Sequence, residues 1–169
     1  MKNTLIPGKK TPSLKVDTLD GASWSIDDHL DKTKYMIVFY RGLHCPVCSD
    51  FLKQIDNQLK EYKKSNTEVI AISMDNKEKA TKAKSTWGIA NLKIAFGLSE
   101  EKAREWGLYI SKSIKESESA IFCEPGLFIT KEDGSLYLAN TSNMPWARPD
   151  VTTLPAKLVF AEENEYPVR

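Results

Sequence analysis

Two cysteines, Cys45 and Cys48, stand two residues apart in the segment Cys45-Pro46-Val47-Cys48. A cysteine thiolate is a nucleophile, and a second thiol nearby can close a disulfide with it or resolve a covalent intermediate. Residues three apart at the start of a helix share a face, so the two sulfurs can meet with little rearrangement. The spacing therefore predicts a redox pair that cycles between dithiol and disulfide.

The chain contains a third cysteine, Cys123, which has no cysteine near it in the sequence. An odd and small number of cysteines does not fit a disulfide scaffold. Two other interpretations of the pair stay open: half of a zinc site that His44 and Cys123 complete, and a structural pair of buried thiols. A second Cys-x-x-Cys and a His-x-x-x-His are both missing from the sequence, so we expect neither a metal nor a cofactor.

The elements on either side of the pair determine what each thiol can do. The apolar run Tyr35–Tyr40 is typical of a strand buried on both faces. After Val47, apolar residues recur at helical spacing, at Phe51, Leu52, Ile55, Leu59 and Tyr62. Cys45 is thus predicted at a helix N-terminus, at the carboxyl end of a buried strand. Free backbone N–H groups and the helix dipole lower a thiol pKa there, so we expect Cys45 to attack and Cys48 to resolve.

The remaining patterns alternate between strand and helix. They predict a hairpin over residues 14–26, a strand over 68–74, a helix from Asp75 or Asn76 to Trp87, a strand over 91–96, a helix after Ser99, a hairpin over 126–139 and a helix over 151–163. This order predicts one α/β domain over residues 1–169, with a central mixed sheet flanked by helices and a β-hairpin at its N-terminus.

Charge and hydropathy exclude several classes of partner. The chain has 24 basic and 23 acidic residues and a formal net charge of +1, which gives no reason to expect a nucleic-acid partner. No apolar run approaches the ~18 residues of a membrane span, and the N-terminus lacks the apolar core of a signal peptide. We therefore expect a cytoplasmic protein without a membrane partner.

The segment from Val38 to Cys48, read as VFYRGLHCPVC, resembles the active-site stretch of the thioredoxin superfamily. It is most similar to the peroxiredoxin-like branch, related to alkyl hydroperoxide reductase and thiol-specific antioxidant proteins. Residues 99–107 and 124–134 are similar to later elements of that family, and Met144–Pro149 looks like another motif of it, with no chemistry attached. The resemblance implies a thioredoxin-like fold and an antioxidant oxidoreductase that reduces disulfides, peroxides or both and draws electrons from an external thiol.

The sequence also departs from the peroxiredoxin pattern Pro-x-x-x-Thr/Ser-x-x-Cys. Val38 and Gly42 stand at the Pro and Thr/Ser positions, and Phe122-Cys123-Glu124-Pro125 stands where peroxiredoxins place an Arg before a hairpin strand. The groups that polarise a peroxide are not recognisable, so disulfide exchange stays open beside peroxide reduction. A thioredoxin-fold binding or scaffold protein without efficient turnover is the alternative function, and a homodimer is left open.

Five residues near the pair are candidates for support of the active site. Arg41, and His44 if protonated, would add positive charge near Cys45, or else face solvent. Glu124 would accept a proton from Cys48 or, as we expect, lie at the surface. Cys123 is expected to be a small core residue, although it precedes the loop that faces the active site in this fold. The resemblance further implies a cis peptide bond before Pro125, opposite the cysteines.

Overall fold

The computed structural model describes residues 4–168. Seven strands form one sheet in the order β2-β1-β5-β4-β3-β8-β9. Their bounds are β1 Lys15–Thr18, β2 Ser23–Ser25, β3 Lys34–Phe39, β4 Thr67–Ile72, β5 Lys93–Phe96, β8 Gly126–Thr130 and β9 Leu136–Thr141. Strands β3, β4 and β5 are parallel, whereas β1, β2, β8 and β9 pair antiparallel with their neighbours. The expected central mixed sheet with an N-terminal hairpin is confirmed.

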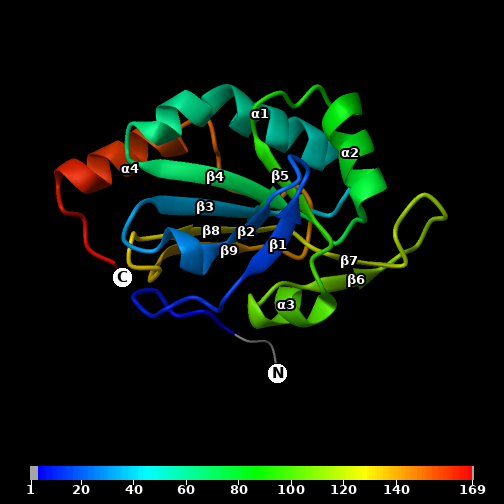
Figure 1. Ribbon diagram of the computed structural model, residues 1–169, viewed down its shortest axis with the longest axis horizontal. Coiled ribbons are helices and arrows are strands. Elements are labelled where there is room, and N and C mark those ends of the chain that lie inside the picture. The colour runs from blue at the N-terminus through cyan, green and yellow to red at the C-terminus, as the bar shows by residue number, and fades with distance from the viewer. Residues whose placement is uncertain (1–3, 169) are drawn as a thin grey trace.

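Helices cover both faces of this sheet. They are η1 Ile26–His29, a 3-10 helix, and α1 Pro46–Lys63, α2 Lys77–Thr86, α3 Glu100–Glu105 and α4 Leu154–Glu163. Figure 1 shows α1, α2 and α4 on one side of the sheet and α3 on the other. No helix within residues 4–168 is long and apolar enough to cross a membrane.

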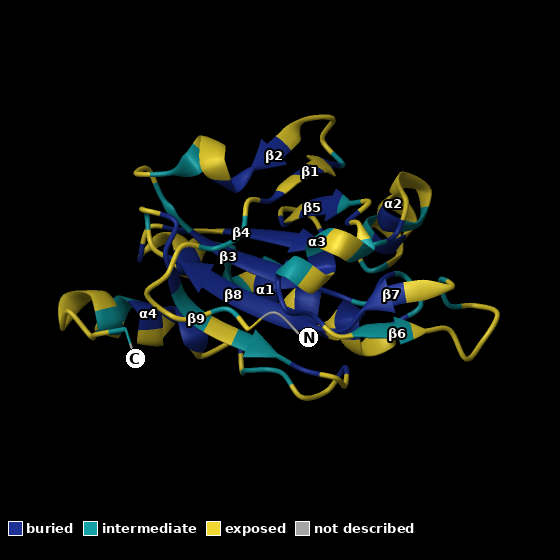
Figure 2. Cartoon of the chain, turned by 90° about the horizontal axis from the view of Figure 1, so that it is seen from below, coloured by how far each residue is buried: buried dark blue, intermediate teal, exposed yellow. Residues whose placement is uncertain are grey.

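Strand β3 carries the core, because its side chains alternate between the two layers. Met36, Val38 and Tyr40 pack in the cluster that includes the buried face of α1. Ile37 and Phe39 pack in the opposite cluster. Both faces of β3 are therefore dry, which explains the unbroken apolar run, and Figure 2 shows the central strands almost wholly buried.

Four segments distant in sequence meet at the end of the sheet where the central strands β3 and β4 terminate. Phe39, the last residue of β3, pairs with Ile72 at the end of β4 and with Gly126 at the start of β8. Gly126 also pairs with Thr141 at the end of β9. The chain before α1, after β4, before β8 and after β9 thus converges where the two cysteines lie.

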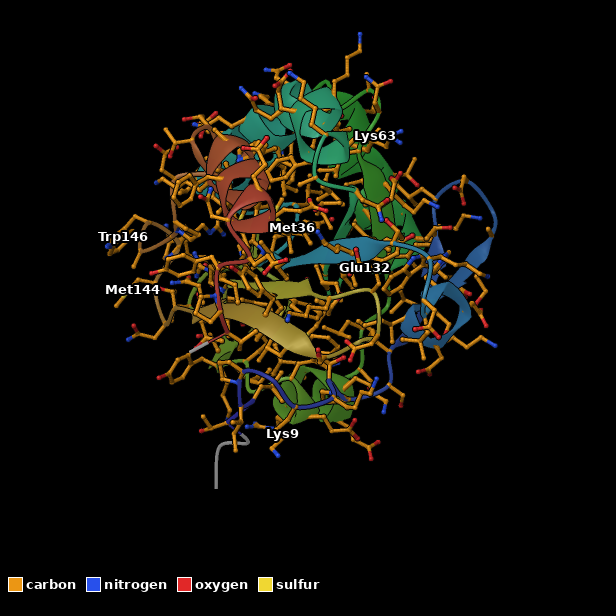
Figure 3. All side chains as sticks on the ribbon, turned by 90° about the vertical axis from the view of Figure 1, so that its left-hand side faces the viewer. Lys9, Met36, Lys63, Glu132, Met144 and Trp146 are labelled. Atoms are coloured by element: carbon orange, nitrogen blue, oxygen red, sulfur yellow. A yellow bond between two sulfur atoms is a disulfide. The ribbon has the colours of Figure 1, made fainter. Side chains whose placement is uncertain are left out.

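Some local expectations are wrong in detail. The C-terminal helix begins at Leu154 rather than at residue 151, which places Pro155 in its first turn, where a proline is tolerated. A two-stranded ribbon, β6 Ile110–Lys112 with β7 Ile121–Cys123, is present and was not predicted. Trp146 is 70% exposed and projects from the edge of the molecule in Figure 3.

Candidate active site

Cys45 is the N-cap residue of α1, as its position after the buried strand predicts. Its sulfur accepts a hydrogen bond from the backbone N–H of Cys48 at 3.2 Å, and Pro46 follows in the first helical turn. A proline there sacrifices no hydrogen bond and fixes a helical φ. The Cys45 sulfur thus occupies the place of a capping oxygen, where a negative charge is favoured.

The two cysteines form a disulfide in the structure, with their Cα atoms 5.2 Å apart. Both residues are buried, Cys45 at 1% and Cys48 at 0% relative exposure, whereas Pro46 and Val47 between them are exposed. Access to the Cys45 sulfur is therefore restricted in the disulfide form. Residues 4–168 contain no group of three or more His, Cys, Asp or Glu side chains that could hold a metal ion.

The loop that presents Cys45 rests on a buried carboxylate, Asp75, which is 2% exposed. Its Oδ2 accepts a hydrogen bond from the Leu43 N–H at 2.7 Å, and its Oδ1 accepts one from the Ser119 hydroxyl at 3.1 Å. Gly42 lies against the same carboxylate with φ of +123°, a conformation that side chains rarely adopt. The sequence suggested Asp75 only as a helix cap, but Asn76 has that role.

Glu124 is buried at 4% exposure, so the expectation that it lies at the surface is wrong. Its Oε1 accepts a hydrogen bond from the Ser111 hydroxyl at 2.7 Å, and its Oε2 forms an ion pair with Arg41 Nε at 3.3 Å. The guanidinium of Arg41 also lies over the Phe122 ring, 4.7 Å from its centroid. A buried carboxylate needs a partner, and the charge of Arg41 balances that of Glu124. The two side chains therefore form a largely buried ion pair.

His44 lies half-buried against Phe122, with ring centroids 4.6 Å apart. Burial, and secondly the charge of Arg41, lower the pKa of His44 below its ordinary value. The imidazole is therefore neutral near pH 7 and adds no positive charge beside Cys45. Of the two roles left open for His44, a cation beside Cys45 is disfavoured by the lowered pKa, and the ring packs against Phe122.

This burial predicts an effect of pH on stability that His44→Gln should reduce. The folded state binds the proton less readily than the unfolded state, whose histidine pKa is about 6.5. The stability that neutral His44 contributes is complete above that value and is lost as the pH falls below it. Urea unfolding at about pH 7.5 and about pH 5.5 should show a smaller loss in the variant than in the wild type. His29 is the same in both proteins, so equal losses would contradict a buried neutral His44.

Cys123 is a core residue at 0% exposure, as expected, and its thiol donates to the carbonyl of Tyr40 at 3.6 Å. Burial raises the pKa of Cys123 to about 12, so it remains a thiol and does not compete with the pair. The bond before Pro125 is trans, and the predicted cis bond is wrong. The Pro125 carbonyl accepts from the Ser142 N–H at 3.0 Å, which ties β8 to the segment after β9.

Arg148 is the site residue that the sequence did not identify. Its Nη2 donates to the Cys48 sulfur at 3.0 Å, and its guanidinium lies over the Phe51 ring, 4.7 Å from the centroid. Burial lowers the pKa of Arg148 to about 10, which still leaves it a cation at neutral pH. Its only signal in the sequence was its place in the Met144–Pro149 motif. The four segments thus hold a disulfide in which the Cys45 sulfur caps α1 and the Cys48 sulfur contacts the Arg148 guanidinium.

The sequence is similar to that of known proteins. The sequence model of the AhpC/TSA family matches residues 7–139. A protein of Mycobacterium tuberculosis (strain ATCC 25618 / H37Rv) that is named as a peroxiredoxin is 26% identical over 141 residues, which cover 80% of this chain and 84% of that protein.

Solved structures share the fold at low sequence identity. The peroxidoxin BcpB from Mycobacterium tuberculosis aligns with a TM-score of 0.75 and 12% identity, covering 97% of this chain and 100% of that one. Peroxiredoxin 6 of Arenicola marina aligns with a TM-score of 0.78 and 18% identity, covering 96% and 76% of the two chains.

Proposed function

Because this chain belongs to the AhpC/TSA family, we propose that it is a thiol-dependent oxidoreductase that reduces peroxides and disulfides through Cys45 and Cys48. The observation that carries the proposal is the placement of Cys45 as the N-cap of α1, bonded to Cys48 within the first turn. A thiolate at that place is stabilised by the backbone, and its resolving partner is already within bonding reach.

The cycle with a hydroperoxide proceeds in three steps. The Cys45 thiolate attacks the terminal peroxide oxygen, the O–O bond breaks, and a sulfenic acid forms while the alkoxide leaves and takes a proton. The Cys48 sulfur then attacks the sulfenic sulfur, releasing water and closing the Cys45–Cys48 disulfide. Two equivalents of an external thiol reduce this disulfide and become a disulfide themselves. With a disulfide substrate, attack by Cys45 gives a mixed disulfide, which Cys48 resolves.

The structure bears on the peroxide branch through Gly42, which stands at the Thr/Ser position of the peroxiredoxin pattern. A Cβ at Gly42 would lie 2.6 Å from Asp75 Oδ2, so the fold has no room for a hydroxyl-bearing side chain there. The guanidinium of Arg148, after β9, contacts the Cys48 sulfur and does not replace that hydroxyl. A peroxide in this site must therefore be polarised by groups other than a Thr or Ser at residue 42.

The test is rapid mixing of the reduced protein with hydrogen peroxide and, separately, with a small disulfide. We expect each oxidant to be consumed stoichiometrically, with peptide mapping showing a Cys45–Cys48 disulfide and a free Cys123 thiol. Reaction no faster than that of a free thiol with both oxidants would instead favour the scaffold alternative. The ratio of the two rates ranks the substrates.

The assembly and the compartment are part of the same proposal. A homodimer is the assembly we consider, and sedimentation of the oxidised and reduced protein tests it. We also propose that the protein works in the cytoplasm, where an external thiol pool returns the disulfide to the dithiol. Imaging of the tagged full chain tests the location.

A further inference from the structure

Arg148 lies in the loop between β9 and α4 and holds one particular sulfur of the pair. We propose that Arg148 is a catalytic residue for exchange at Cys48. Its guanidinium stabilises the Cys48 thiolate that forms when the disulfide opens, and it positions that thiolate for attack when the disulfide closes. The inference rests on the proposed redox cycle of Cys45 and Cys48 and assigns a role within it. Its supporting contact is the 3.0 Å hydrogen bond from Arg148 Nη2 to the Cys48 sulfur.

The guanidinium of Arg148 has no anionic partner in the disulfide form. Among residues 4–168 no carboxylate lies within ion-pair distance of it, and its Nη1 is buried without a hydrogen-bond acceptor. Two charged residues that act on Arg148 electrostatically, Arg41 and Glu124, are paired with each other. A partly buried cation and an unsatisfied buried donor are both unfavourable, so this site gains stability when an anion forms beside it. The Cys48 thiolate is the anion that reduction creates there.

The loop that carries Arg148 is fixed at both ends, so the cation is preorganised. At one end the Ser142 N–H donates to Pro125 O at 3.0 Å. At the other, Val151 is buried at 0% exposure and its carbonyl accepts from the Tyr62 hydroxyl at 2.9 Å. Between them the guanidinium packs on Phe51, which lies one turn beyond Cys48 on α1. The cation therefore does not have to be ordered when the thiolate appears.

In the reductive half of the cycle an external thiolate attacks the Cys45 sulfur. A bond forms between the external sulfur and Cys45, the Cys45–Cys48 bond breaks, and its electron pair leaves on Cys48 as a thiolate beside Arg148. A leaving thiol of lower pKa leaves faster, so Arg148 directs the attack to Cys45 and accelerates it. The reverse step, attack of the Cys48 thiolate on an oxidised Cys45, uses the same contact.

The test compares Arg148→Met with Arg148→Lys, which keeps the charge, and with Arg104→Met on α3 as the matched control. Arg104 pairs with Glu100 on the surface of α3. We expect Arg148→Met to slow reduction of the disulfide by dithiothreitol about tenfold, and to shift its equilibrium toward the disulfide about tenfold, or about 30 mV. Arg148→Lys should fall between wild type and Arg148→Met, and Arg104→Met should match the wild type.

The first chemical step separates this role from a general effect. In a Cys48→Ser background, Arg148→Met should leave the rate of sulfenic acid formation at Cys45 unchanged within about threefold. A tenfold loss of that rate would show that Arg148 acts on Cys45 and would overturn the proposal. Reduction of Arg148→Met by dithiothreitol at the wild-type rate would overturn it as well. The dithiothreitol measurements need no peroxide, so they test Arg148 even if peroxide turnover fails. Circular dichroism and urea unfolding test whether Arg148→Met is folded. If it is not, the rate of disulfide reduction by dithiothreitol in Arg148→Lys, compared with that in Arg104→Met, decides the question.

Discussion

Replacing Cys45 by serine is expected to abolish turnover with peroxide and with disulfide, whereas replacing Cys48 stops the cycle after its first step. Only Cys45 caps α1, where the Cys48 N–H contacts its sulfur. Serine at residue 45 keeps a capping oxygen, so the fold should be retained while the nucleophile is lost. In Cys48→Ser a sulfenic acid, or a mixed disulfide with a thiol, should accumulate, because the resolving sulfur is missing.

Mass spectrometry after oxidant treatment and steady-state assays with a thiol reductant measure both effects. Cys123→Ser is the matched control, because Cys123 is buried and its burial raises the pKa of the thiol to about 12. It should turn over like the wild type. Activity of Cys45→Ser would refute the mechanism. Turnover of Cys48→Ser together with loss in Cys123→Ser would make Cys123 the resolving thiol.

The patterns that predicted correctly are those that a few neighbouring residues determine. The run Tyr35–Tyr40 reports a strand that is dry on both faces, and the helical spacing after Val47 reports one buried face of α1. Together these fix Cys45 at the strand-to-helix junction. Asn76 and Ser99 cap their helices for the same local reason, since a side-chain oxygen reaches an N–H three residues ahead.

The errors concern residues whose surroundings come from distant parts of the chain. Glu124 is buried because Arg41, which lies across the sheet edge, pairs with it. Arg148 reaches Cys48 over 100 positions of sequence, and only the β8–β9 pairing brings its loop there. Trp146 lies two residues before Arg148 in the same loop, where the aromatic side chain projects outward. No local pattern reports such contacts, so the usual exposure of glutamate side chains favoured the surface for Glu124, which is buried.

Gly42→Ala is expected to destabilise the fold and to impair the chemistry together. An alanine at φ of +123° is strained by about 1–3 kcal/mol. Its Cβ would lie 2.6 Å from Asp75 Oδ2, which must move and release the partly buried Leu43 N–H, at a further cost of about 1–3 kcal/mol. The Gly42 carbonyl also accepts from the Cys45 N–H at 3.1 Å, so the nucleophile shifts with the loop. A misplacement of about 1 Å can cost about 10²-fold in kcat/KM.

Gly21→Ala is the matched control, because Gly21 also has a positive φ, +88°, but a Cβ there meets nothing within 4 Å. Gly21→Ala should lose only about 1–3 kcal/mol of stability through strain and should keep its activity, since residue 21 lies in the β1–β2 turn away from the cysteines.

In Asp75→Ala the steric part of the Gly42→Ala cost disappears, so the stability losses of the two changes should be less than additive in urea unfolding. Equal costs at Gly42 and Gly21, or strict additivity with Asp75→Ala, would show that the carboxylate does not hold the loop. Loss of activity in Asp75→Ala alone is expected as well, because the Leu43 N–H then has no acceptor to fix the approach to Cys45.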